Sequence, residues 1–108
     1  MAYDQKLASR VRERLRDVPQ FEEREKMGGH SFMVSGTVRL RVQDGDLVVR
    51  CEPGRTEELL GRRGVQRFTM KGKTQMKGWV LVSPEVLRTK KDLDFWIDVA
   101  IEFGANRR

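Results

Sequence analysis

The first part of the chain repeats hydrophobic residues with the period of a helix. Leu7, Val11 and Leu15 recur every four residues, and most positions between them are charged. Apolar residues at this spacing lie on one face of an α-helix. We therefore expect an amphipathic helix over residues 3–17 that ends before Pro19.

The middle of the chain changes to the shorter period of β-strands. Val38, Leu40 and Val42 alternate with arginines, and apolar runs lie before and after them. Serine, aspartate and glycine pairs between these runs are typical of tight hairpin turns. We predict an antiparallel meander with strands over 30–34, 37–42 and 47–51 and turns at Ser35-Gly36 and Asp44-Gly45. The mixed-sign run before it, Glu22, Glu23 and Glu25 among Arg24 and Lys26, is typical of a solvated surface.

The second half of the chain predicts a short helix, a buried strand and a longer helix. Residues 56–60 favour a helix that ends at Gly61 or Gly64, and the apolar run 79–82 favours a central, well-buried strand. Two helix starts follow, at Ser83-Pro84-Glu85 and at Thr89 with Asp92 three residues later. The last helix begins there, presents a wide apolar surface and has Gly104 as its natural stop.

These elements predict one α+β domain over residues 1–108, with helices packed as a second layer on a mainly antiparallel sheet. The expected order is helix, three strands, short helix, one or two strands, and C-terminal helix. A chain of 108 residues buries roughly two-thirds of its unfolded surface, so the core needs neither a disulfide nor a structural metal.

Charge is distributed unevenly along this fold. Lys and Arg number 22 against 16 Asp and Glu, a net charge of +6. No acidic residue lies between Glu58 and Glu85, so the window 59–84 carries the whole excess. We expect this window to be a long loop with some extended structure and one local basic patch. Its six basic residues are the candidate anion or nucleic-acid contacts: Arg62, Arg63, Arg67, Lys71, Lys73 and Lys77.

Two interpretations of the basic window stay open. Its cations can follow a nucleic-acid backbone while Phe68 or Trp79 stacks on a base. In the other interpretation Phe68 and Trp79 belong to the core and the cations lie on a solvated loop.

The catalytic and metal-binding patterns that we tested do not fit. Gly72-Lys73-Thr74 ends like a phosphate-binding loop, but Arg67 stands where that motif needs glycine. His30 is expected at a strand edge, without the partners that acid–base catalysis requires. Cys51 is interpreted as a buried packing residue. Asp44 and Asp46 lack further oxygen ligands at calcium-loop spacing. We predict no enzyme activity, cofactor, metal or small-molecule substrate.

The residues also indicate a compartment. The lone cysteine cannot form an internal disulfide, the N-terminus lacks the apolar core of a signal peptide, and no stretch reaches the roughly 18 apolar residues of a membrane helix. We expect a cytoplasmic protein without membrane contact.

Four segments resemble one protein family: MAYDQKLASRVRERL at the start, GGHSFMVSG at 28–36, DLVVRC at 46–51 and MKGWVLVSPE at 76–85. They are similar, in order, to the N-terminal domain of the TfoX/Sxy proteins, regulators associated with bacterial natural competence. Met27 stands where relatives usually have phenylalanine in a Met-Phe-Gly-Gly stretch.

The resemblance implies an α+β fold related in shape to type III secretion chaperones, a regulatory or protein-interaction role, and no established catalytic activity. Longer members carry a second domain that resembles helix-hairpin-helix DNA-binding modules. Because this sequence ends at Arg108, we expect the stand-alone form of the N-terminal domain. Two hypotheses follow: a domain that binds a protein partner or itself through an exposed strand edge, and a nucleic-acid-binding module that uses the window 59–84.

Overall fold

The structure, a computed structural model, describes residues 3–26, 28–70 and 74–103, without the side chains of residues 26, 69, 70 and 74–77. Its helices and its strands alternate in groups along the chain. The helices are α1 (Gln5–Leu15), α2 (Thr56–Leu60) and α3 (Lys90–Glu102). The strands are β1 (Phe21–Lys26), β2 (Gly29–Val34), β3 (Thr37–Gln43), β4 (Asp46–Arg50), β5 (Val65–Met70) and β6 (Thr74–Val82).

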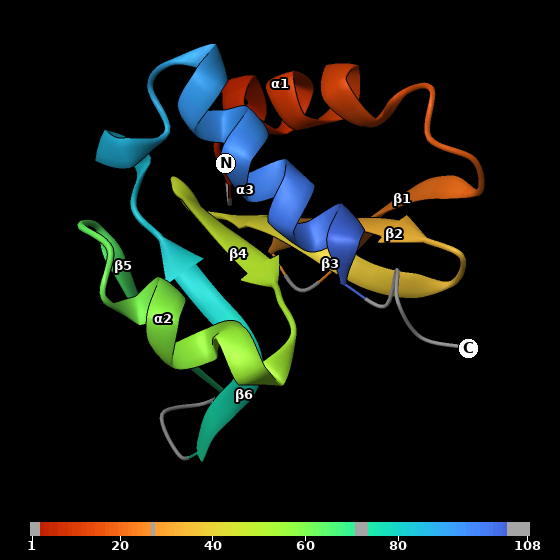
Figure 1. Cartoon of the computed structure of the whole chain (residues 1–108). Helices are drawn as coiled ribbons and strands as arrows, with labels where there is room; N and C mark the ends of the chain where they lie inside the picture. The colour runs from red at the N-terminus through yellow and green to blue at the C-terminus, as the bar shows by residue number, and fades with distance from the viewer. Residues whose placement is uncertain (1–2, 27, 71–73, 104–108) are drawn as a thin grey trace.

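The strands form one sheet in the order β1-β2-β3-β4-β6-β5, and every neighbouring pair is antiparallel. Helices α1 and α3 lie together on one face of it, and α2 lies beside β6 (Figure 1). The predicted α+β class is confirmed. The predicted strands over 30–34, 37–42 and 47–51 correspond to β2, β3 and β4.

The buried apolar side chains form one cluster between the helices and this face of the sheet. All three described helices contribute to it: Val11 and Leu15 come from α1, Leu59 from α2 and Ile97 from α3. The sheet contributes the residues that face the helices: Phe32, Leu40, Val42, Leu47, Val49, Val80 and Val82. The core therefore lies on one side of the sheet.

The helix boundaries follow from local capping. The Asp4 carboxylate accepts hydrogen bonds from the backbone N–H groups of Lys6 and Leu7 and so begins α1. Thr89 begins α3 in the same way, accepting from the N–H of Asp92, as the sequence predicted. Gly61 ends α2. Helix α3 ends at Glu102, and the predicted stop, Gly104, lies outside the described residues.

One predicted surface segment is a strand. Residues 21–26 form β1, an edge strand paired with β2 along its whole length. Only Phe21 is apolar in this strand, so hydrophobic alternation does not reveal it. Glu23 lies opposite the core residue Phe32 and faces the helix layer, where Arg12 of α1 binds it. This ion pair replaces the apolar contacts on which sequence patterns depend.

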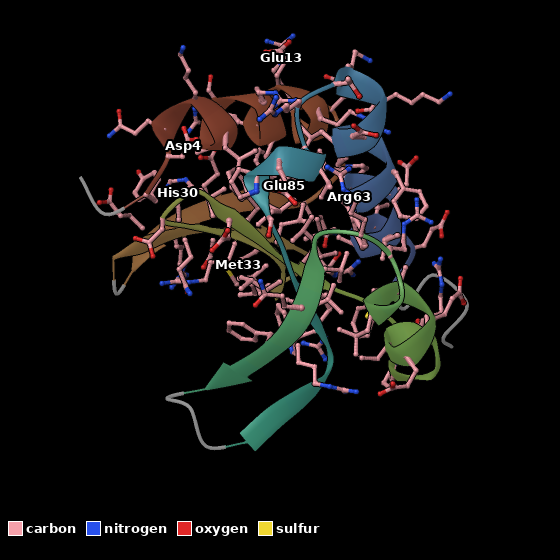
Figure 2. The ribbon with its side chains drawn as sticks, turned by 90° about the vertical axis from the view of Figure 1, so that its left-hand side faces the viewer. Asp4, Glu13, His30, Met33, Arg63 and Glu85 are labelled. Atoms are coloured by element: carbon pink, nitrogen blue, oxygen red, sulfur yellow. The ribbon has the colours of Figure 1, made fainter. Side chains whose placement is uncertain are left out.

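The basic window was predicted as a long loop with some extended structure, and its extended part is larger than expected. Most of it forms the antiparallel hairpin of β5 and β6, which projects from the rest of the sheet (Figure 2). The register shifts between Arg67 and Thr69, because five steps along β6 oppose only two along β5. Gly78, at φ 86°, lies in this irregular part of β6 and supplies a backbone conformation that other residues resist.

The first of the two predicted helix starts is a single turn. Pro84–Val86 form a 3-10 turn after Ser83, whose side chain makes no capping hydrogen bond. The helix proper starts only after Thr89, where the side-chain cap is present.

Candidate functional site

The face of the sheet opposite the helices carries a second set of apolar side chains. Cross-strand pairing places Leu81 of β6 beside Val48 of β4, and Met33 of β2 beside Val38 of β3. In Figure 2, Met33 lies across the sheet from α1. We call this surface the open face and define it by six residues: Met33, Val38, Val48, Phe68, Trp79 and Leu81.

None of these six side chains belongs to the core cluster or packs against it. Val48 is 1% exposed, so neighbouring side chains already cover it. The other five are half-buried. Phe68 and Trp79 contact each other with ring centroids 6.2 Å apart and planes at 47°. No described helix covers this face.

Trp79 is thus placed differently from its prediction. The run 79–82 was expected to be buried throughout, but only Val80 and Val82 enter the core, while Trp79 and Leu81 point to the open face. The interpretation that Phe68 and Trp79 are core residues is wrong for the same reason. Strand side chains alternate between faces, and the described helices cover only one face of this sheet.

One basic side chain borders the aromatic pair, and a second lies elsewhere on the open face. The Arg50 guanidinium lies 4.9 Å from the Trp79 ring centroid and 4.3 Å from that of Phe103. Arg41, on the same face, donates to the Ser31 hydroxyl at 3.2 Å and lies over Gly29, where a Cβ would come within 2.5 Å of its guanidinium. Aromatic rings beside arginines are common at the centres of protein interfaces.

Arg39 does not share the open face, although it lies between Val38 and Leu40. In the pairing of β2 with β3, Phe32 faces Leu40 and the next residue, Met33, faces Val38, so Arg39 is the extra residue of a bulge. Its guanidinium donates to the carbonyls of Ala100, Ile101 and Phe103 at the end of α3. Burial, and then the nearby Arg50 cation, lower the pKa of Arg39. The bulge therefore redirects a cation to the carbonyl end of a helix.

Of the predicted anion contacts that the structure describes, Arg62 and Arg63 line one pocket and Arg67 binds α2. Arg62 lies over the Phe95 ring at 4.2 Å, and Arg67 forms an ion pair with Glu57 of α2 at 3.1 Å. Arg63 is exposed and lines a shallow pocket with Arg62, Glu85 and Asp92. Lys71 and Lys73 lie outside the described residues, as does the side chain of Lys77. The three described arginines thus have carboxylates near them in space, although the sequence window has none.

His30 is not at a strand edge. It lies in β2, between β1 and β3, and its Nε2 is 2.6 Å from the Glu23 carboxylate. Glu23 also accepts from Arg12 of α1 at 2.8 Å, and the Tyr3 hydroxyl is 3.4 Å from the other His30 ring nitrogen. The hydrogen bond from Arg12 is the largest cause that lowers the pKa of Glu23, and the bond with His30 lowers it further against the opposing effect of burial. This network joins α1 to β1 and β2.

Cys51 is buried, as predicted. Its side chain is 0% exposed and its thiol lies 3.8 Å from the Thr56 hydroxyl, which also accepts from the Gly78 N–H at 3.1 Å. Burial raises the pKa of the Cys51 thiol. These contacts join the end of β4 to α2 and β6, a packing role.

A groove between α1 and α3 was missed by the sequence analysis. Lys6, Arg10 and Arg14 lie along it at intervals of four residues, and Arg88 and Lys90 face them. The four-residue spacing of the three α1 cations is the sequence pattern that predicts a row of basic side chains on one face of the helix. The net charge outside the window 59–84 is zero, which concealed it.

Among the described residues, no group of three or more His, Cys, Asp or Glu side chains is arranged to hold a metal ion. No helix among them has the length and apolar character needed to cross a membrane.

Comparison with known proteins gives one family match. The family model described as the TfoX N-terminal domain matches residues 13–104. The curated proteins give no match, and neither do the solved structures.

Proposed function

The chain belongs to the TfoX N-terminal domain family, and from this membership and the open face we propose that it is a non-enzymatic regulatory domain that acts by binding protein in the cytoplasm. The observation that carries the proposal is the Phe68–Trp79 pair. Two large aromatic side chains, half-buried and outside the core, lie on a sheet face that no described helix covers. Contiguous apolar side chains on a surface favour contact with another macromolecule.

The edge strands indicate where such contact begins. Edge β1 carries three glutamates, an arginine and a lysine, and charges of this kind protect an edge against pairing. Edge β5 carries Arg67 as its one charged residue and also carries Phe68 of the open face. Edge and face meet at Phe68, so a second copy or another protein can pair with the strand and cover the aromatic pair together.

The test uses two substitutions that add the same charge at different surfaces. Phe68→Glu places a charge in the open face, whereas Gln5→Glu adds it at an exposed position of α1, in the helix layer. Light scattering over a range of concentrations measures self-association, and capture from a lysate of the source organism measures other partners. We expect association that Phe68→Glu abolishes and Gln5→Glu preserves. A strict monomer that retains no protein would overturn the proposal.

The second candidate is nucleic-acid binding through Arg62, Arg63, Arg67, Lys71, Lys73 and Lys77. It is supported by the exposure of Arg63 and by the projecting hairpin that carries Arg67 and Lys77. The pairing of Arg67 with Glu57 opposes it, because a phosphate would compete with that carboxylate.

A further inference from the structure

The helix layer contains an open groove of about 800 Å³ between α1 and the start of α3, on the other side of the sheet from the open face. Five of its nine lining residues are basic and two are acidic. The nine are Lys6, Ser9, Arg10, Glu13, Arg14, Arg88, Lys90, Leu93 and Asp94.

Internal contacts satisfy only part of this charge. Arg14 binds Asp94 and Asp98, and Lys90 binds Asp94 at 3.2 Å. One nitrogen of Arg10 donates to the backbone carbonyls of Arg88 and Thr89. Among the described residues, Lys6 and Arg88 form no ion pair within 4.0 Å, and both are exposed. Two cations at one end of the groove thus face solvent.

The floor of the groove is the edge of the core. Leu93 lies among the lining residues, and a second pocket continues from Lys6, Arg10 and Arg88 to Leu7 and Leu87, but none of these three leucines is more than 4% exposed. Long basic side chains can offer the apolar surface of their methylene stems while their charges stay at the rim. The groove therefore has a basic rim above the stems of its own lysines and arginines.

We propose that this groove binds an acidic amphipathic segment of a partner protein. Such a helix would place its apolar stripe over the methylene stems that line the groove and carboxylates at intervals of four residues against Lys6, Arg10 and Arg88. Nucleic acid fits less well, because the Glu13 and Asp94 carboxylates line the groove and repel a continuous row of phosphates. The site extends beyond the matched family segment, since Lys6 and Arg10 precede residue 13.

The probe is a fluorescein-labelled amphipathic peptide of about 14 residues, long enough to span roughly 21 Å as a helix, with leucines on one face and glutamates beside them. Its control has glutamine in place of every glutamate. Binding is measured by fluorescence anisotropy to the whole chain. The test variant is Lys6→Glu with Arg88→Glu, and the matched control is Lys91→Glu with Arg24→Glu, two exposed cations that do not line the groove.

We expect the acidic peptide to bind the wild-type protein, and the glutamine peptide to bind about tenfold more weakly. The Lys6/Arg88 variant should lose about tenfold in affinity while the Arg24/Lys91 variant stays within about twofold of wild type. Circular dichroism confirms that both variants fold. Failure of the peptide to bind, or equal losses in the two variants, would overturn the proposal. It is also overturned if duplex DNA displaces the peptide and loses affinity in the Lys6/Arg88 variant.

Discussion

Phe68 and Trp79 contact each other across β5 and β6, 6.2 Å between ring centroids, on the sheet face that carries no described helix. The Arg50 guanidinium, from the neighbouring strand β4, lies 4.9 Å from the centroid of the same tryptophan ring and helps to fix its position. Aromatic side chains fixed in this way lose little conformational entropy when a partner covers them. This relationship is the physical basis for the proposed binding role.

The Glu23 network predicts a stability that depends on pH. Glu23→Gln should lower the free energy of unfolding by about 1 kcal/mol at pH 7, because it removes the ion pair with Arg12. The pKa of Glu23 is lowered in the folded protein, so its contribution is present above the unfolded pKa of about 4.3 and is lost as pH falls through the folded pKa.

Urea unfolding between pH 7 and pH 3 measures this effect. The control is Glu22→Gln, the neighbouring exposed residue on the other face of β1. We expect the wild type and the Glu23 variant to converge at low pH, and the Glu22 variant to match wild type throughout. A Glu23 difference that is independent of pH would contradict the assigned role.

The Arg39 bulge predicts a local effect at the end of α3. Arg39→Met keeps much of the side-chain volume but removes the donor to the Ala100, Ile101 and Phe103 carbonyls. We expect a loss of about 1.5–3 kcal/mol in unfolding free energy, the usual range for hydrogen bonds that involve a charged group. Hydrogen exchange should accelerate most in the last turn of α3. Uniform acceleration over the whole chain would show that the cation does not act as a local cap.

Substitutions at two glycines can distinguish the stability cost of backbone strain from the cost of steric overlap. Gly36 and Gly64 have φ of 80° and 79°. A Cβ at Gly36 has no atom within 4 Å, whereas one at Gly64 would lie 2.8 Å from both γ-methyl carbons of Val86. Gly36→Ala should cost about 1 kcal/mol and Gly64→Ala about 2–4 kcal/mol. Thermal unfolding measures both, and Val86→Ala should recover part of the Gly64→Ala loss. Equal costs at the two glycines would refute the predicted overlap.

The sequence predicted the helices and the meander because their side chains follow regular periods. It did not predict β1, since Glu23 replaces an apolar residue on the inner face and its partners, Arg12 and His30, come from other elements. Ion pairs between residues that are far apart in the sequence produce no regular pattern of apolar residues along the chain.

The candidate site was predicted only in part. The sequence identified Phe68 and Trp79 as competing core or binding residues, but one apolar run cannot tell whether a sheet is covered on both faces. The basic window drew attention because it lacks acids in sequence, although Glu57 comes close to Arg67 in space. The basic stripe of α1 was concealed by a balanced charge count.

The nucleic-acid alternative predicts a steep salt dependence. If all six candidate cations contact phosphates, log affinity should fall with log salt at a slope of about −4 to −5. Arg63→Glu, Arg67→Glu and Lys71→Glu combined should abolish binding, while Glu57→Gln should strengthen it by releasing Arg67. Fluorescence anisotropy with a short duplex measures both. Weak binding that none of these substitutions changes would rule out the window as the contact.

The open face is tested most directly by locating the partner on it. A photo-crosslinking amino acid is placed at Leu81, on the open face, or at the exposed Asp17, which follows α1 in the helix layer. Each protein is irradiated in a lysate of the source organism and the adducts are resolved by mass. We predict a discrete adduct, with this chain or another protein, from position 81 and none from position 17. Equal adducts from both positions, or none from position 81, would contradict the assignment of the open face as the binding surface.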